Sequence, residues 1–258
     1  MGFDAAWLTL REPADARARA TSLRDRALRL VGPGDTVLDL GCGTGATPRA
    51  FAAQGATDLH WRLFDNDPDL LAEAAAQHPG TTILEGDLAD IEAVPLEGAK
   101  VVTASALLDL VSRDWLERFA ERLSRAGVAF YAVLSYDGRM RWTPGDPADA
   151  EVTAAFNAHQ RGDKGLGPAL GPDAGETAAD VFRAHGFEVT LAQSPWQLGP
   201  DDADLHDALL SGIAQAATEA GCDAADAWLA RRRGDLAQLE AEIGHLDLLA
   251  VPQGRPVA

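Results

Sequence analysis

The sequence predicts an α/β protein in which a mainly parallel β-sheet is covered by helices on both faces. Short apolar segments alternate with helical patterns of about 10–15 residues, as in βαβ proteins. The segment "VAFYAVLSY" at 128–136 is almost wholly apolar, as expected for a strand that is buried on both faces. The glycine-rich stretch "GCGTG" joins an apolar strand directly to a helix. Together these observations imply right-handed crossovers between parallel strands.

The first half of the chain supplies the regular alternation. A helix is expected over 14–31, because Leu23, Ala27 and Leu30 recur at helical spacing and "GPGD" follows. Pro68 opens a later helix at a position where its missing N–H has no cost. The remaining elements are expected, in order, as a strand at 36–40, a helix at 46–55, a strand at 59–65, a helix at 68–78, strands at 81–87 and 99–108, a helix at 112–127 and a strand at 128–136.

The alternation breaks after residue 137. Loops rich in Gly and Pro flank a short helix that is expected at 148–160. A helix at 176–186, a strand at 187–198, helices across 202–241 and a last strand at 245–252 then follow. We interpret 1–258 as one domain, with an N-terminal helical lid at 1–33 and decorations over or beside the pocket at 137–175 and 201–241. The helices at 202–241 are expected either to cover the pocket or to contact a second copy in a homodimer.

Composition restricts the possible partners. Among 258 residues, 47% are hydrophobic and the formal net charge is −18, so a large core is expected and a nucleic-acid or anionic membrane partner is disfavoured. Two cysteines, Cys42 and Cys222, are too few for a disulfide scaffold and favour a reducing cytoplasm. The N-terminus lacks a signal-peptide pattern, and no apolar run reaches the roughly 18 residues of a membrane span. No metal site is predicted.

The stretch "VLDLGCGTGA" at 37–46 predicts a ligand-binding loop at the end of the first strand. Gly41, Gly43 and Gly45 leave bare backbone there, and the following helix start adds unpaired N–H groups with partial positive charge. Dinucleotide enzymes place a pyrophosphate on a similar loop, and Gly41 to Ala46 also satisfies their pattern. The glycines alone therefore leave an NAD(P)-dependent oxidoreductase, or a purely structural turn, as alternatives.

Three acidic residues at successive strand ends favour a different ligand. Asp39 lies two residues before the first glycine, where it would repel a pyrophosphate and attract a cation. Asp65 ends the second strand, where a carboxylate can accept from both ribose hydroxyls; its alternative is to cap the next helix. Asp87 ends the third strand in "EGDL", where it can accept from an adenine amine; its alternative is a solvated loop acid. The pattern predicts a ligand with ribose, adenine and positive charge but no phosphate.

With these motifs the sequence resembles the class I S-adenosylmethionine-dependent methyltransferases. The resemblance depends on "VLDLGCGTG" (37–45), "LFDNDPDLLAEA" (63–74), "LEGDL" (84–88) and "VVTASALLDLV" (101–111). It implies a Rossmann-like three-layer sandwich with a seven-stranded, mostly parallel sheet whose last strand is antiparallel, a role that suits 245–252. It also implies an enzyme that uses S-adenosylmethionine and releases S-adenosylhomocysteine; a non-catalytic S-adenosylmethionine-binding protein remains an alternative.

The resemblance also implies the residues that bind the cofactor. The loop glycines would lie under the methionine part and ribose, Asp65 on the ribose diol, Asp87 at the adenine amine, and the Leu88 N–H at the ring. Asp39 would support the loop and the amino group, and Ala104 or Ser105 would line the floor near the methyl group. The implied cofactor-binding set is Asp39, Gly41, Gly43, Gly45, Asp65, Asn66, Asp87, Leu88, Ala104 and Ser105.

The acceptor side is less defined. Enzymes that methylate nucleobase amines commonly carry an Asn/Asp-Pro-Pro-aromatic tetrapeptide after the fourth strand, whereas this chain has "ASALLDL", which favours a small-molecule acceptor. Asp109 and His159 are the candidate catalytic bases. Tyr136, Arg139 and Trp142 are candidates for substrate binding, with packing of a lid as the alternative. Arg11 is a candidate for the cofactor carboxylate.

Overall fold

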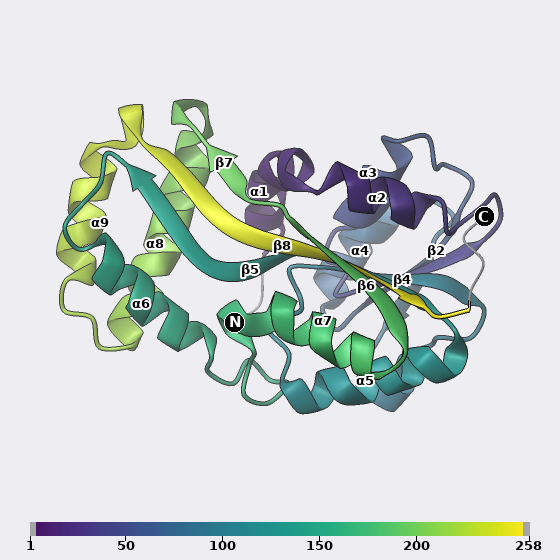
Figure 1. Ribbon diagram of the computed structural model, residues 1–258. Coiled ribbons are helices and arrows are strands. Elements are labelled where there is room, and N and C mark those ends of the chain that lie inside the picture. Colours follow the sequence, from purple (N-terminus) through teal and green to yellow (C-terminus); the bar gives the residue numbers. More distant parts are fainter. Residues whose placement is uncertain (1–3, 255–258) are drawn as a thin grey trace.

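One eight-stranded β-sheet organises the chain, which a computed structural model describes over residues 4–254 (Figure 1). The strand order is β3-β2-β1-β4-β5-β8-β6, and β7 also pairs with β8. The five strands from β1 to β5 are mutually parallel, whereas β8 is antiparallel to β5, β6 and β7. The strands are β1 (Thr36–Leu40), β2 (His60–Asp65), β3 (Thr82–Glu85), β4 (Ala99–Ser105), β5 (Ala129–Thr143), β6 (Phe187–Gln193), β7 (Trp196–Leu198) and β8 (Glu240–Pro252). The predicted fold class, with its antiparallel last strand, is confirmed; β7 is an additional strand.

Helices cover both faces of this sheet. They are α1 (Ala5–Ala18), α2 (Thr21–Leu28), α3 (Ala46–Ala52), α4 (Pro68–Gln77), α5 (Arg113–Ala126), α6 (Asp149–Gln160), α7 (Ala174–Ala184), α8 (Ala203–Glu219) and α9 (Ala225–Gly234). Neighbouring strand residues point to opposite faces, so Val102 packs with α5 and α7 while Val101 packs with α2, α3 and α4. This arrangement gives the predicted three layers. Within residues 4–254, no helix has both the length and the apolar character needed to cross a bilayer.

A second hydrophobic cluster extends the molecule beyond the parallel strands. The long strands β5 and β8 continue out of the main sheet towards α6, α8 and α9 (Figure 1). Trp142, Trp196, Trp228 and Ile243 are buried there, and α1 contributes Ala14 to the same cluster. Helix α1 is therefore packed against this second cluster, which shares β8 with the main sheet.

The single helix predicted at 14–31 is wrong. Helix α1 begins earlier because the Asp4 side chain caps it, accepting from the Trp7 N–H at 2.7 Å. The helix ends at Arg19, whose φ of −47° and ψ of 128° are not helical. At this break the Ala20 N–H donates to Asp247 Oδ2 at 2.8 Å. A buried carboxylate of β8 therefore accepts the hydrogen bond of a backbone N–H at the helix break.

The predicted boundaries after residue 136 are also wrong. The "DG" at 137–138 resembles a turn, but Gly138, with φ of +86°, lies at an irregularity within β5, which pairs with β8 as far as Thr143. Consequently β8 begins at Glu240 rather than at residue 245. The predicted strand at 187–198 is divided at Ser194, whose hydroxyl donates to Asp247 Oδ1 at 2.6 Å.

Candidate active site

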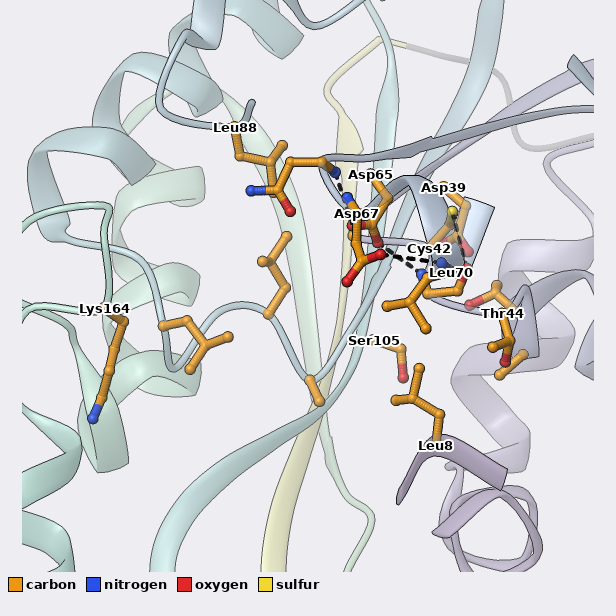
Figure 2. A pocket seen from close by; sticks show the side chains of 18 of the residues that line it. Leu8, Asp39, Cys42, Thr44, Asp65, Asp67, Leu70, Leu88, Ser105 and Lys164 are labelled. Atoms are coloured by element: carbon orange, nitrogen blue, oxygen red, sulfur yellow. Dashed lines mark hydrogen bonds between the residues drawn. The ribbon is translucent and has the colours of Figure 1, made fainter. Parts of the chain in front are cut away.

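A cavity of about 360 Å³ lies at the carboxyl ends of β1, β2 and β4 and beneath α1 (Figure 2). Parallel strands bring their carboxyl ends to one edge of a sheet, so Asp39, Asp65 and Ser105 meet there although they are distant in sequence. The volume is in the range of small-molecule and cofactor sites. The cavity is thus where the fold and the sequence both predict ligand binding.

The glycine loop forms one wall of this cavity. Gly41, Gly43 and Gly45 have φ values of +58°, +53° and +83°, a conformation that disfavours other residues. Gly41 and Gly43 line the cavity, and a Cβ on Gly43 would lie 2.9 Å from Leu8 Cδ1 of α1. Gly45 is outside the lining, and its Cβ would lie 2.5 Å from His78 Nε2. The last glycine therefore allows α4 to pack closely on the loop.

Asp65 secures the loop and faces the cavity. Its Oδ2 accepts from the Gly43 N–H at 2.8 Å, and its Oδ1 accepts from the N–H groups of Asn66 and Asp67 at 2.8 and 3.1 Å. The alternative role as the cap of α4 is wrong, because Asp67 caps that helix through the Leu70 and Asp69 N–H groups. Each carboxylate oxygen has more than one lone pair, so Asp65 retains acceptor capacity for a ligand hydroxyl.

Asp39 is a buried acid beside the same loop. Only 2% of the residue is exposed, and Oδ1 accepts from the Thr103 hydroxyl at 2.6 Å. Burial raises the pKa of Asp39 to about 7, although the hydrogen bond from Thr103 and the charge of Arg19 oppose the rise. Its carboxyl group lines the cavity, where a cationic ligand would stabilise the ionised form and an anionic ligand would disfavour it.

The other predicted cofactor residues divide between the cavity and the core. Asn66, Asp87, Leu88 and Ser105 line the cavity, whereas Ala104 is buried in β4 outside the lining. Asp87 is exposed and its Oδ1 accepts from the Ala89 N–H at 2.8 Å. The Leu88 carbonyl accepts from Trp115 Nε1 at 2.7 Å, which fixes this loop to α5.

Helix α1 contributes Leu8, Arg11 and Asp15 to the lining, of which the sequence indicated only Arg11. Arg11 donates to Asp15 through Nε at 2.9 Å and Nη2 at 3.1 Å, and Trp196 Nε1 donates to Asp15 at 2.9 Å. The Arg11 guanidinium also lies 5.0 Å from the Trp196 ring centroid. Asp15 follows Arg11 by four residues, but the same spacing is common in solvated ion pairs, so the sequence alone did not identify Asp15.

Asp109 lies in sequence between the lining residues Leu107 and Leu110 but is not itself among the residues that line the cavity. Its Oδ1 is buried and accepts no hydrogen bond from any residue between 4 and 254. Burial raises the pKa of Asp109 to about 6, against the positive charges of Arg11 and Lys164. This acid is therefore close to charged groups of the site without itself being in the lining.

The other catalytic candidate, His159, does not reach the cavity. Its Nε2 lies 2.9 Å from Glu219 Oε2, which ties the end of α6 to α8. Its Nδ1 is 3.4 Å from the ammonium of Lys164, a residue of the lining that the sequence did not indicate. His159 therefore contacts the site only through Lys164.

The structure also places Tyr136, Arg139 and Trp142 outside the cavity lining. The Tyr136 hydroxyl donates to Asn157 at 2.8 Å, and Arg139 pairs with Asp137. The Trp142 ring packs 5.9 Å from that of Trp228 in the second cluster. The extension of β5 carries these residues out of the cavity lining, and Trp142 is buried in the second cluster.

Cys42 is the one cysteine in the lining, and burial raises the pKa of its thiol far above the ordinary value, so the unreactive thiol form persists. Within residues 4–254, no cluster of three or more His, Cys, Asp and Glu side chains is arranged to hold a metal ion. The polar side chains of the cavity include carboxylates, the cations Arg11 and Lys164, and the neutral groups of Asn66 and Ser105.

Comparisons with known proteins agree with this fold. Residues 37–127 match a family model described as a methyltransferase domain. The cyclopropane synthase MmaA2 of Mycobacterium tuberculosis is 16% identical, with a TM-score of 0.52 over 95% of this chain and 94% of that one. A Geobacter sulfurreducens S-adenosylmethionine-dependent methyltransferase, solved with S-adenosylhomocysteine, is also 16% identical, with a TM-score of 0.50 over 98% and 100% of the two chains. No curated protein matches the sequence significantly. The structural likenesses support the fold over nearly the whole chain.

Proposed function

We propose that the chain transfers a methyl group from S-adenosylmethionine to a small-molecule acceptor, because residues 37–127 match a family model described as a methyltransferase domain. The observation that carries the proposal is the buried carboxyl of Asp39, which faces the cavity beside a glycine loop held by Asp65. That combination suits a nucleoside with a cationic tail. It opposes a dinucleotide, whose pyrophosphate would lie against Asp39.

The residues of the lining fit this cofactor. Asp65 would accept from the ribose hydroxyls, and Asp87 would accept from the adenine amine beside the Leu88 N–H. Asp39 would stabilise the positive end of the molecule, and Gly41 and Gly43 give it close access to the backbone.

When bound, S-adenosylmethionine supplies a methyl group that its sulfonium already activates. The protein then has to align the acceptor and exclude water. Leu8 and other α1 residues of the lining cover the site, which supports the assignment of the N-terminal segment as a lid. We propose Asp109 as the base that removes a proton from an O–H or N–H acceptor, because its buried Oδ1 has no hydrogen-bond partner within residues 4–254 and burial raises its pKa to about 6. This role requires the side chain to turn into the cavity, since Asp109 is not among the lining residues.

The acceptor is proposed to be a small molecule with an apolar part. Leu107, Leu110 and Leu166 give the cavity apolar lining against which such an acceptor would pack, and the net charge of −18 disfavours a nucleic acid. Cys42 and Cys222 are both free, which supports a cytoplasmic location.

Isothermal titration with S-adenosylmethionine, S-adenosylhomocysteine and NAD⁺ tests the cofactor. Asp65→Ala should weaken binding of the first two by about 1–3 kcal/mol, since buried polar partners lose an acceptor. Asp90→Ala is a matched control, because Asp90 is exposed and its side chain caps no helix. Binding of NAD⁺ instead would contradict the proposal. Transfer of a labelled methyl group to a component of a metabolite extract separates an enzyme from a non-catalytic binding protein.

A further inference from the structure

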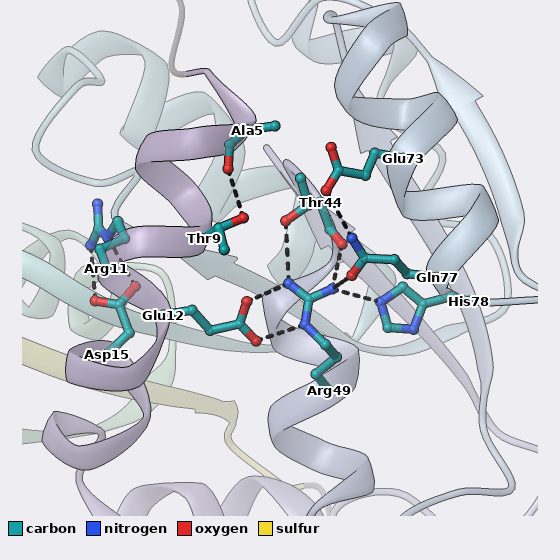
Figure 3. Close-up of polar contacts among 10 residues, drawn as sticks. All are labelled: Ala5, Thr9, Arg11, Glu12, Asp15, Thr44, Arg49, Glu73, Gln77 and His78. Atoms are coloured by element: carbon teal, nitrogen blue, oxygen red, sulfur yellow. Dashed lines mark hydrogen bonds and ion pairs between the residues drawn. The ribbon is translucent and has the colours of Figure 1, made fainter.

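Arg49 of α3 connects three elements around the cofactor loop (Figure 3). Its Nε and Nη2 donate to the two carboxylate oxygens of Glu12 on α1, each at 2.6 Å. Its Nη1 donates to the Thr44 carbonyl at 2.6 Å, and Nη2 also donates to the Thr44 hydroxyl at 3.2 Å. One guanidinium therefore holds both the lid helix and a residue of the glycine loop that lines the cavity.

The same guanidinium reaches the end of α4. Nη1 donates to Gln77 Oε1 and lies 3.2 Å from His78 Nε2. Burial and the charge of Arg49 lower the pKa of His78, so the neutral ring accepts this contact. His78 is also the side chain that packs against Gly45. The network thus joins the glycine loop to both α1 and the end of α4.

The position of Glu12 on α1 gives this network a consequence for ligand binding. Leu8 lies one helical turn before Glu12, and Arg11 directly precedes Glu12. A Cβ on Gly43 would lie 2.9 Å from Leu8 Cδ1. Leu8 and Arg11 both line the cavity. Helix α1 cannot move off the cavity at this turn without breaking the bond between Glu12 and Arg49.

We propose that Arg49 is a positioning residue that couples closure of α1 over the cavity to the conformation of the glycine loop. The proposal rests on the function proposed above for this cavity. The ion pair is bidentate, and its side chains are only 27% and 30% exposed, so it is stronger than a solvated surface pair. A ligand on the loop is retained while this pair is closed and is released when the pair opens.

The chain offers a matched control on the same helix. Arg17 of α1 pairs with Asp202 at 2.7 Å, which attaches α1 to the 3-10 helix before α8 and not to the loop. Arg17→Ala therefore removes an ion pair of α1 but leaves the Arg49 network intact.

Dissociation of S-adenosylhomocysteine, followed by stopped-flow tryptophan fluorescence, tests the coupling. Glu12→Ala and Arg49→Lys should each accelerate dissociation by about 10-fold, equivalent to about 1.4 kcal/mol. Arg17→Ala should change the rate by less than about two-fold. The effects of Glu12→Ala and Arg49→Lys should not add in the double variant, because both changes weaken the same ion pair.

Amide hydrogen exchange of the ligand-free protein gives a second readout. Glu12→Ala should accelerate exchange both in α1 and at loop residues 43–47, whereas Arg17→Ala should affect α1 alone. Unchanged dissociation and unchanged loop exchange in Glu12→Ala would overturn the coupling. If the wild-type chain binds no S-adenosylhomocysteine, the proposed function fails and hydrogen exchange alone decides the coupling.

Discussion

Binding of S-adenosylmethionine should depend on pH through the ionisation of Asp39. In the free protein the pKa of this carboxyl is about 7, compared with an ordinary value of 3.8, so the group is largely protonated below neutral pH. The cationic ligand requires the ionised form. The sign follows: affinity should fall as the pH is lowered through about 7, and it should reach a plateau above that value.

The magnitude follows from the fraction of ionised Asp39. If the carboxylate of Asp39 returns to its ordinary pKa in the complex, the affinity falls about tenfold per pH unit below about pH 7. Between the plateau above pH 7 and pH 5 the affinity then falls about 100-fold, equivalent to about 2.7 kcal/mol. Below about pH 7 the ligand's own α-amino group remains protonated and does not confuse the measurement. Titration calorimetry in two buffers of different ionisation enthalpy should show release of roughly half a proton at pH 7.

Asp39→Asn supplies the control. It keeps an acceptor for the Thr103 hydroxyl but cannot ionise, so its affinity should be weak and independent of pH. The unliganded wild-type protein should lose stability as the pH rises from about 4 to about 7, by up to about 4 kcal/mol, because the unfolded chain ionises this group first. A flat wild-type profile, or an equal slope in Asp39→Asn, would refute the reasoning.

Three further predictions concern other residues. Asp247→Ala should lower the free energy of unfolding by about 3 kcal/mol or more in urea titrations. The reason is that the Asp247 carboxylate accepts hydrogen bonds from the Ala20 N–H, the Leu134 N–H and the Ser194 hydroxyl. A loss below about 1 kcal/mol would contradict this account. Gly45→Ala should weaken S-adenosylhomocysteine binding and lower the thermal midpoint, because of the positive φ and the nearby His78 ring; wild-type values would show that the loop adapts. Asp109→Asn should lower kcat and remove the fall of kcat on the acidic side of the pH profile near pH 6, while the affinity for S-adenosylhomocysteine stays unchanged. An unaltered pH profile of kcat would exclude Asp109 as the base.

The sequence predicted the part of the site that depends on local patterns. Asp39 and Asp65 belong to buried strands with clear ends, and parallel strands bring such ends to one edge, so their meeting at the cavity could be anticipated. Asp67, rather than Asp65, caps α4, in agreement with its position directly before Pro68. The order of alternating strands and helices was sufficient for the fold class.

Residues whose partners are distant in sequence could not be predicted in the same way. Asp15 accepts a hydrogen bond from Trp196, which lies 181 positions later in the sequence. Arg49 donates to Glu12, which lies 37 positions earlier. Nothing in the local pattern around these residues distinguishes them from solvated helix residues. Trp142 had the composition of a ligand-binding residue, but the unexpected continuation of β5 buries it in the second cluster.

The position of β8 has a consequence for biosynthesis. This strand lies between β5 and β6 and pairs Phe130 with Ala250, so the sheet cannot be completed before the segment 240–252 has left the ribosome. Until then β5 and β6 expose unpaired edges, which are sites for aggregation. Released chains that end before residue 240 should therefore engage chaperones, whereas chains that include the thirteen residues of β8 should not.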